Sequence, residues 1–399
     1  MRQMATAVLD LDFDDLPPEI TGLDGYSRAL VLIRMRGRPV GQALLPVEDG
    51  RAGGKDALRD ALLYAADSGF WEQWLRRFLD LEERTQVRGA LPEASVAVCT
   101  RDRTDDLRRC LEALARLPDI GQEILVVDNC PSSESTRHLV AERKKVRYVR
   151  EERPGLDIAR NRAMREARKE IIAFTDDDAT PDPGWLANLL RNFDDPHVLC
   201  VTGMTMPMEL ETRAQEYFQR AGGLGRGFKR TVYDSACHNP LEGWQAGAGV
   251  NMALRRTVLD LIGPFDECLD VGTPVQGGGD SDIFGRILAK GFRIVYDPEA
   301  LNWHRHRRDW EGLRRQLRGY ESAGFAVWTR SLIVEGEVEA LAQAWHWLNR
   351  ELPALARSLL GLPGSAPRDL ILARFRGAAT GPWAYLYAHR RPRERGTWP

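Results

Sequence analysis

The chain has 399 residues, of which 43% are hydrophobic and 29% charged, and its formal net charge is -2. The length suggests two or three domains, and the composition is that of an ordinary globular protein. The small net charge gives no indication of a nucleic-acid partner, and no apolar run approaches the roughly 18–20 residues that cross a bilayer. An acidic N-terminus without a signal-peptide core, and six cysteines without a C-x-x-C pair, predict structural thiols and a cytoplasmic location.

Residues 1–90 differ in pattern from the rest of the chain. Two strand-like runs flank the turn Gly37-Arg38-Pro39, and residues 54–83 then place apolar side chains at helical spacing. No residues in this segment have the spacing of a catalytic site. We therefore predict a small N-terminal α+β module, of β-β-α type, that docks onto or braces the rest of the protein.

From Ala94 onward, short apolar runs alternate with helical patterns. We predict strands at 95–100, 123–129, 146–150 and 170–178, joined by helices, and hence a Rossmann-like, mainly parallel α/β sheet with helices on both faces. In such sheets, ligands bind beyond the carboxyl ends of the strands. Three of these ends carry polar residues that we expect at one edge: Thr100-Arg101, Asp128-Asn129 and Asp176-Asp177-Asp178.

The three consecutive aspartates need a positive partner, because like charges this close repel. On an extended strand Asp176 and Asp178 point the same way. Carboxylates without a nearby cysteine suit a hard cation such as Mg²⁺ or Mn²⁺, which commonly also binds substrate phosphates. The pattern therefore predicts a metal that arrives with a diphosphate ligand. An acidic turn solvated at the surface is the alternative.

Other nucleotide-binding motifs are absent from the sequence. The first strand runs into Cys99-Thr100-Arg101-Asp102-Arg103, with no G-x-G-x-x-G, and no G-x-x-x-x-G-K-[ST] loop occurs. The glycine-rich stretch 221–228 follows no apolar strand and is interpreted as a loop. The sequence thus argues against a Rossmann dehydrogenase.

A second cluster of chemistry-bearing residues lies in 243–306. Small residues at Gly247-Ala248-Gly249 allow close approach of a ligand to the backbone. Asp280 and Asp282 follow three glycines and open an amphipathic helix, while His304 and His306 follow a predicted strand.

The C-terminal part, 311–399, is predicted to be a helical extension. Residues 343–362 fit either packing on the preceding domain, which we favour, or an interfacial helix on a membrane. The basic run Arg390-Arg391-Pro392-Arg393 fits either a solvated terminus or contact with anionic lipid.

Several motifs occur in an order that points to one family. They are "VAVCTRDR", "ILVVDN", "GLDIARNRA", "FTDDDATPDPGWL", "GAGVNMALRR", "GPFDE", "GGGDSD" and a late histidine. Through them residues 94–308 resemble a family-2 glycosyltransferase, the inverting type built on the A-type fold. A catalytic domain at 91–310 follows from this resemblance.

The resemblance implies a donor side. It predicts that Thr100, Arg101 and Asp128 hold the nucleotide base, and that Arg160 and Asn161 lie beside the nucleotide. Asp176, Asp177 and Asp178 match the D-x-D element, in which Asp178 would bind the metal, Mn²⁺ or Mg²⁺, and Asp176 the metal or ribose. His304 matches a late histidine that approaches the metal, with His306 as a second candidate.

The resemblance also implies an acceptor side. Asp280 would be the general base that deprotonates the acceptor hydroxyl. Asp282 would support the acceptor or the base. Trp244 fits either a packing role or stacking on a sugar face. Gly279 departs from the family pattern, in which Glu is common, and this departure leaves the acceptor contacts open.

We therefore expect an inverting glycosyltransferase that moves a sugar from a nucleotide diphosphate, most readily a UDP-sugar, to a hydroxyl of a glycan, a lipid-linked acceptor or a small molecule. One alternative is a sugar nucleotidyltransferase, which usually has a basic glycine-rich loop after the first strand. Another is a non-catalytic relative that binds nucleotide or sugar. The sequence does not indicate the acceptor, the donor sugar or the oligomeric state.

Overall fold

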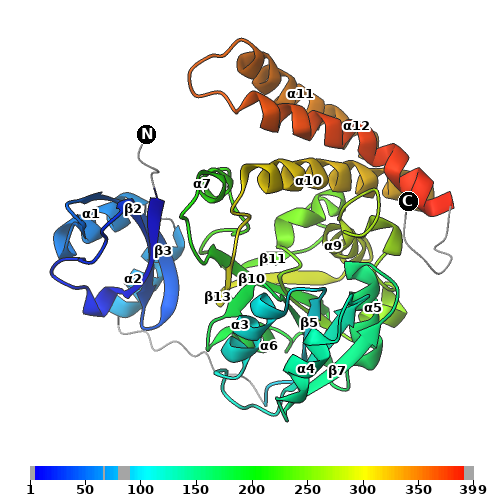
Figure 1. Ribbon diagram of the computed structural model, residues 1–399, viewed down its shortest axis with the longest axis horizontal. Coiled ribbons are helices and arrows are strands. Elements are labelled where there is room, and N and C mark those ends of the chain that lie inside the picture. Colours follow the sequence, from blue (N-terminus) through cyan, green and yellow to red (C-terminus); the bar gives the residue numbers. More distant parts are fainter. Residues whose placement is uncertain (1–4, 66–67, 80–89, 391–399) are drawn as a thin grey trace.

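The computed structural model describes residues 5–65, 68–79 and 90–390 (Figure 1). The N-terminal segment forms its own four-stranded sheet in the order β1-β2-β3-β4. The strands β2 and β3 form the hairpin predicted around Gly37, and β1 adds to β2 in parallel. The elements are β1 (Ala5–Asp12), β2 (Tyr26–Met35), β3 (Arg38–Glu48), β4 (Arg51–Ala52), α1 (Lys55–Ala65) and α2 (Ser68–Phe78).

The second sheet has the strand order β11-β13-β10-β12-β8-β5-β6-β7, and β9 pairs with β13 beside this path. The four predicted strands are confirmed as β5 to β8 and run parallel, whereas β12 is antiparallel to its neighbours β8 and β10. The strands are β5 (Ala94–Thr100), β6 (Glu123–Asn129), β7 (Val146–Glu151), β8 (Ile171–Asp176), β9 (Ala179–Pro181), β10 (Val198–Pro207), β11 (Thr231–Tyr233), β12 (Asn251–Arg255) and β13 (Arg293–His304).

Helices cover both faces of this sheet. One apolar cluster packs Leu107 and Trp185 against the strands, and a second packs Ala163 and Ile287 against the opposite face. This arrangement confirms the predicted α/β architecture. The helices are α3 (Thr104–Leu114), α4 (Ser135–Ala141), α5 (Leu156–Glu166), α6 (Trp185–Leu190), α7 (Arg213–Arg220), α8 (Val258–Leu261) and α9 (Gly279–Ala289).

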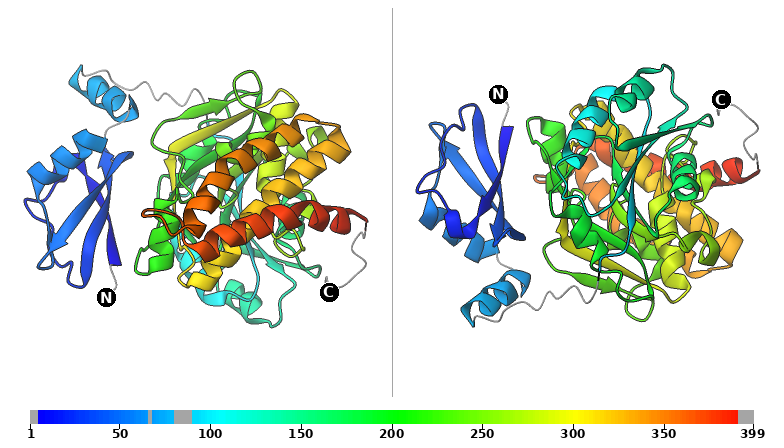
Figure 2. Two further views of the ribbon diagram at one scale, coloured as in Figure 1. Left: turned by 90° about the horizontal axis from the view of Figure 1, so that it is seen from above. Right: turned by 90° about the horizontal axis from the view of Figure 1, so that it is seen from below.

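Three long helices, α10 (Trp310–Arg330), α11 (Glu339–Leu359) and α12 (Arg368–Arg390), follow the sheet and lie across one side of it (Figures 1 and 2). Glycines let α10 and α12 approach closely, because a Cβ at Gly377 would lie 2.2 Å from the carbonyl oxygen of Arg318. Arg374 of α12 also bridges Glu321 of α10 and Glu351 of α11 at 2.7 Å. The predicted helical extension is therefore confirmed for the residues up to 390.

The helix α11 has one packed face and one open face. Trp347 is buried and donates its indole N–H to Glu321. Other apolar side chains of α11 remain at least half exposed: Leu341, Trp345, Leu352 and Leu359. No helix in the described residues is long and apolar enough to span a membrane. Of the predicted basic run, the part from residue 391 lies outside the described residues.

The N-terminal sheet packs against the second sheet. Leu30 and Leu32 of β2 join an apolar cluster with Met204 and Leu301. Ion pairs flank this contact: Arg34 reaches Asp182 at 2.6 Å, and Arg28 reaches Glu216 at 2.9 Å. These contacts are what a bracing module requires. The division of the chain at residues 90 and 310 stays a prediction.

Candidate active site

The strand register brings the predicted polar tips to one edge. Thr100 at the end of β5 pairs with Asp128 on β6, and Cys99 pairs with Asp176 on β8. Because these strands are parallel, their carboxyl ends meet. The short strand β9 then pairs with the end of β13, so that His304 lies opposite Ala179, next to Asp178.

Asp176, Asp178 and His304 form a three-ligand cluster. One ligand atom from each lies within 4.8 Å of the others. His304 Nε2 is 3.3 Å from Asp178 Oδ1. Asp178 Oδ1 is buried and has no hydrogen-bond partner among the described residues. An unpaired carboxylate oxygen in such a place is costly unless a ligand completes it, so the site fits a cation.

A histidine relay presents His304 Nε2 to this cluster. His306 Nε2 lies 3.2 Å from Gln219 Oε1, which can only accept, so His306 donates there. Burial, together with His304, lowers the pKa of His306 to about 3, and the ring is neutral. Its Nδ1 can therefore accept a hydrogen bond from His304 Nδ1 at 3.1 Å, a contact that orients the His304 ring with Nε2 toward Asp178. Of the two candidate histidines, His304 faces the cluster.

Arg103 neutralises part of the acidic tip. Its guanidinium bonds Asp177 Oδ1 at 2.6 Å and Asp178 Oδ2 at 2.7 Å. Burial would raise the pKa of Asp178, but His304 and Arg103 hold it below its usual range. Thr100 donates its hydroxyl to Asp177 Oδ2 at 2.7 Å, and burial raises the Asp177 pKa to about 7. Both oxygens of Asp177 are thus engaged within the protein.

Asp128 offers one carboxylate oxygen. Tyr148 donates to Oδ2 at 2.8 Å, while Oδ1 is buried without a hydrogen-bond partner among the described residues. The Thr136 hydroxyl lies nearby but makes no hydrogen bond of good geometry to it. Burial raises the Asp128 pKa, and the bond from Tyr148 opposes this shift. Arg101, the other predicted base contact, lies exposed in the loop after β5.

The helix α5 is held by hydrogen bonds to residues that lie more than one hundred positions later in the chain, Asp270 and Phe265. Its cap, Gly155, provides no side chain, and the Asp270 carboxylate instead accepts the N–H of Leu156 at 2.6 Å. The side-chain amide of Asn161 forms two hydrogen bonds with the backbone of Phe265, so it fixes the loop that contains Phe265 against α5. The predicted contact of Asn161 with nucleotide stays a prediction.

Asp280 lies half-buried at the start of α9. Its Oδ2 accepts the Gly249 N–H and its Oδ1 the Ser281 N–H, both at 2.8 Å. Burial lowers the pKa of Arg160, but Asp157, Asp176 and Asp280 together raise it above its usual value. A Cβ at Gly249 would lie 2.5 Å from Arg160 Nη2 and 3.1 Å from Asp280 Oδ2, so this guanidinium lies close to Asp280. That both acidic regions serve one site stays a prediction.

Residues 95–262 match the family model described as glycosyl transferase family 2. These residues form a family 2 glycosyltransferase domain. The sheet has the A-type glycosyltransferase fold. A mannosyltransferase from Pyrobaculum calidifontis, solved in complex with GDP-Man and Mn²⁺, superposes with a TM-score of 0.51 at 19% identity over 78% of this chain and 94% of that one.

Curated glycosyltransferases are similar to part of this chain. The pre-mycofactocin glycosyltransferase of Mycobacterium tuberculosis is 27% identical over 59% of this chain and 48% of its own length. Glycosyltransferase AglE of Haloferax volcanii is 24% identical over 64% of this chain and 81% of its own. The chain thus spans about half the length of the first of these relatives.

Two predicted acceptor-side residues differ in their surroundings. Asp282 is buried and forms ion pairs with Arg286 at 2.7 Å and Arg330 at 3.1 Å. Trp244 is 47% exposed, with Arg226 over its ring at 5.8 Å. Of the two alternatives for Trp244, exposure agrees better with stacking than with packing.

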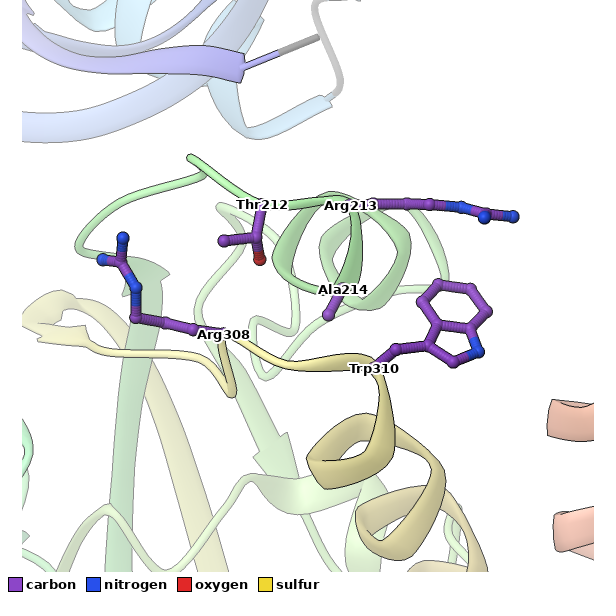
Figure 3. Close-up of a pocket in the computed structure, with 5 residues that line it drawn as sticks. All are labelled: Thr212, Arg213, Ala214, Arg308 and Trp310. Carbon is purple, nitrogen blue, oxygen red and sulfur yellow. The ribbon is translucent and has the colours of Figure 1, made fainter. Parts of the chain in front are cut away.

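A surface pocket of about 290 Å³ is lined by Thr212, Arg213, Ala214, Arg308 and Trp310 (Figure 3). Figure 3 shows side chains from the start of α7 above Arg308 and Trp310. Arg308 is paired with Glu209 and Glu211, and Arg213 stacks on Trp310 at 4.5 Å. The pocket contains none of the predicted site residues.

Sequence reasoning missed Arg103, Tyr148 and Asp157 as members of the site. Arg103 carried a signal, because a basic residue directly after the first strand must lie near the edge where the aspartates meet. Tyr148 lies on β7, two residues before Arg150, which pairs with Asp128, and the Tyr148 hydroxyl reaches the Asp128 carboxylate. Asp157 gave no sequence signal, since its neighbour across space, Gly279, is 122 residues away along the chain.

Proposed function

We propose that this chain is an inverting, metal-dependent glycosyltransferase that uses a UDP-sugar and a hydroxyl acceptor. One observation carries the proposal. Asp176, Asp178 and His304 offer three ligand atoms within 4.8 Å of one another, and the charges of both Asp176 and Asp280 act on the buried guanidinium of Arg160. The family 2 glycosyltransferase domain supports the same class of reaction.

The donor set supports Mn²⁺ in preference to Mg²⁺. Two carboxylates and a neutral imidazole would hold the ion, and Mg²⁺ favours all-oxygen surroundings. When bound, such an ion stabilises negative charge on a leaving diphosphate. The Mn²⁺ bound by the Pyrobaculum mannosyltransferase agrees with this choice.

The surroundings of Asp128 support uracil over guanine. Uracil presents one imide N–H, whereas guanine presents an N–H and an amino group side by side. Asp128 Oδ1 has no hydrogen-bond partner among the described residues, whereas Oδ2 already accepts from Tyr148. The unpartnered oxygen can accept the single imide N–H of uracil, so we propose UDP as the nucleotide.

Asp280 would perform the proton transfer. The acceptor oxygen forms its bond to the anomeric carbon while the bond from that carbon to the diphosphate oxygen breaks. The diphosphate leaves with the electron pair, and the hydroxyl proton passes to Asp280. Each carboxylate oxygen of Asp280 accepts one backbone N–H and keeps a second lone pair for this proton. One displacement inverts the anomeric configuration.

The sugar nucleotidyltransferase finds less support. The loop after β5 contains no glycine that would cradle a triphosphate, and Arg103 in that loop is already paired with Asp177 and Asp178. A non-catalytic relative finds less support as well, because Asp280 remains half-buried and accessible.

We also propose a cytoplasmic location with peripheral membrane contact through α11. None of the six cysteines, all within the described residues, forms a disulfide, as expected in a reducing compartment.

The exposed apolar face of α11 is accompanied by Arg350, which is also exposed. Co-sedimentation with vesicles of neutral or anionic lipid tests this contact, and Trp345→Glu should abolish it. Protein that stays in the supernatant with both lipids contradicts it.

The function is tested by incubating the protein with UDP-glucose, UDP-galactose or UDP-N-acetylglucosamine and Mn²⁺. We expect release of UDP, and proton NMR should show the β-anomer as the first product from these α-linked donors. A parallel incubation supplies glucose 1-phosphate and UTP. UDP-glucose formed in that arm, without turnover in the first, would overturn the proposal in favour of nucleotidyl transfer.

A further inference from the structure

The glycine before Asp280 leaves a space that another residue fills. A Cβ at Gly279 would lie 1.9 Å from Asp157 Oδ2 and 2.5 Å from Asp157 Cγ. No side chain fits at position 279 while Asp157 keeps this place. The carboxyl group of a residue on α5 therefore occupies the side-chain position of the first residue of α9.

Asp157 is tied to Arg160 inside the protein. Arg160 Nη1 bonds Asp157 Oδ1 at 3.0 Å, and Arg160 and Asp157 are only 6% and 2% exposed. Removing one member of such a pair leaves the other buried without a partner. The position of the Arg160 guanidinium thus depends on Asp157.

Arg160 in turn borders the proposed base. Its Nη2 would lie 2.5 Å from a Cβ at Gly249, so the guanidinium rests against the Gly249 backbone. The N–H of Gly249 holds Asp280 Oδ2 at 2.8 Å. A continuous set of contacts runs from Asp157 through Arg160 and Gly249 to Asp280.

We propose that Asp157 is a positioning residue for glycosyl transfer. From α5 it places a carboxyl group where a side chain of residue 279 would lie, and it fixes Arg160 against Gly249, whose N–H holds Asp280. This inference rests on the proposed function, since Asp280 is the group that it positions. Asp157 acts through Arg160 and does not touch the reacting atoms.

The experiment moves the carboxyl group from one chain position to the other. Four proteins are compared: wild type, Asp157→Ala, Gly279→Glu, and the double variant Asp157→Ala/Gly279→Glu. Asp157→Ala should lower kcat for UDP-sugar turnover about 30-fold, with the donor KM changed less than about threefold. Gly279→Glu alone should be at least as impaired, because its side chain collides with Asp157.

The double variant decides the proposal. With the Asp157 carboxylate removed, the side chain introduced by Gly279→Glu has room, and its carboxyl group can pair with Arg160, so kcat should recover about tenfold over Asp157→Ala. A purely structural ion pair would recover the melting temperature without recovering kcat. A folded double variant no faster than Asp157→Ala, or an Asp157→Ala protein with wild-type kcat, would overturn the proposal.

Folding and function are separated by two further measurements. If Asp157→Ala does not fold, Asp157→Asn replaces it, because asparagine keeps the shape of the side chain. In that case the double variant Asp157→Ala/Gly279→Glu must fold. Melting temperatures of the four proteins require no turnover. If the wild type turns over no nucleotide sugar, the proposed function fails. The melting temperatures still test the contact between residues 157 and 279. A double variant whose melting temperature falls by more than the sum of the two single decreases would show that the two side chains do not share one place. Asp119→Asn, on an exposed loop, serves as the matched control.

Discussion

The donor side of the site, at the ends of β5, β6, β8 and β13, differs from the base side, formed by α5, Gly249 and α9. On the donor side, buried oxygens of Asp128 and Asp178 lack a hydrogen-bond partner among the described residues. On the base side, Asp157, Asp280 and Asp282 are each held by hydrogen bonds or ion pairs within the protein. We therefore expect ligands to complete the donor side, whereas the base side is organised before they arrive.

The comparison predicts that changes on the base side affect turnover more than binding. Asp280→Asn should lower kcat about 10²–10⁴-fold, the usual contribution of a general base. Affinity for UDP with Mn²⁺, measured by calorimetry, should change less than about threefold. A variant that loses affinity in proportion to turnover would place Asp280 on the donor side.

Changes on the donor side should affect binding first. Asp178→Asn should weaken Mn²⁺-dependent UDP binding about 100-fold, because it removes a ligand and leaves Arg103 with one acidic partner fewer. Chelation of Mn²⁺ with EDTA should lower UDP affinity of the wild type and leave the variant nearly unchanged. Equal Mn²⁺ titrations of wild type and variant would contradict the assignment of the ligand cluster.

The neutral state of His306 gives the donor side a pH dependence of stability. The folded pKa, about 3, lies below the reference value of 6.5, so the unfolded chain binds a proton first as pH falls. His306 should therefore contribute about 2 kcal/mol to the loss of unfolding free energy between pH 7.5 and pH 5. Urea unfolding of wild type and His306→Phe at both pH values measures this loss. The same loss in both proteins would show that His306 is charged in the fold.

The histidine relay should have the smallest effect. Gln219→Leu removes the acceptor that fixes the His306 ring, and Mn²⁺ affinity should fall about tenfold, as for other residues behind a metal ligand. Gln343→Leu, on α11, is the control. An unchanged Mn²⁺ affinity in Gln219→Leu would mean that His304 keeps its tautomer without the relay.

The same division explains what the sequence predicts. Strand ends are local, so the convergence of Asp128, Asp176 and Asp178 follows from apolar runs and parallel pairing. Arg160 pairs within its own helix but reaches Asp280 only through packing of α5 against α9, which no local pattern encodes. Partners on the base side therefore escape prediction.

Asp282 is a residue that the sequence predicted on the acceptor side but that the structure places in the interior. Two acids two residues apart look alike in a sequence, but successive helical residues turn by about 100°, so the second points about 200° away from the first. Asp280 faces the site, while Asp282 faces Arg286 and Arg330 in the interior, where burial raises its pKa against the effect of both arginines.

The packing of β2 against the second sheet has a practical consequence for the expression of shortened forms of this protein. Leu30 and Leu32 cover Met204 and Leu301, so a chain trimmed to begin at residue 90 would display those side chains to water. An exposed apolar surface of this kind favours aggregation. Assays of sugar transfer are therefore best run with the first ninety residues retained.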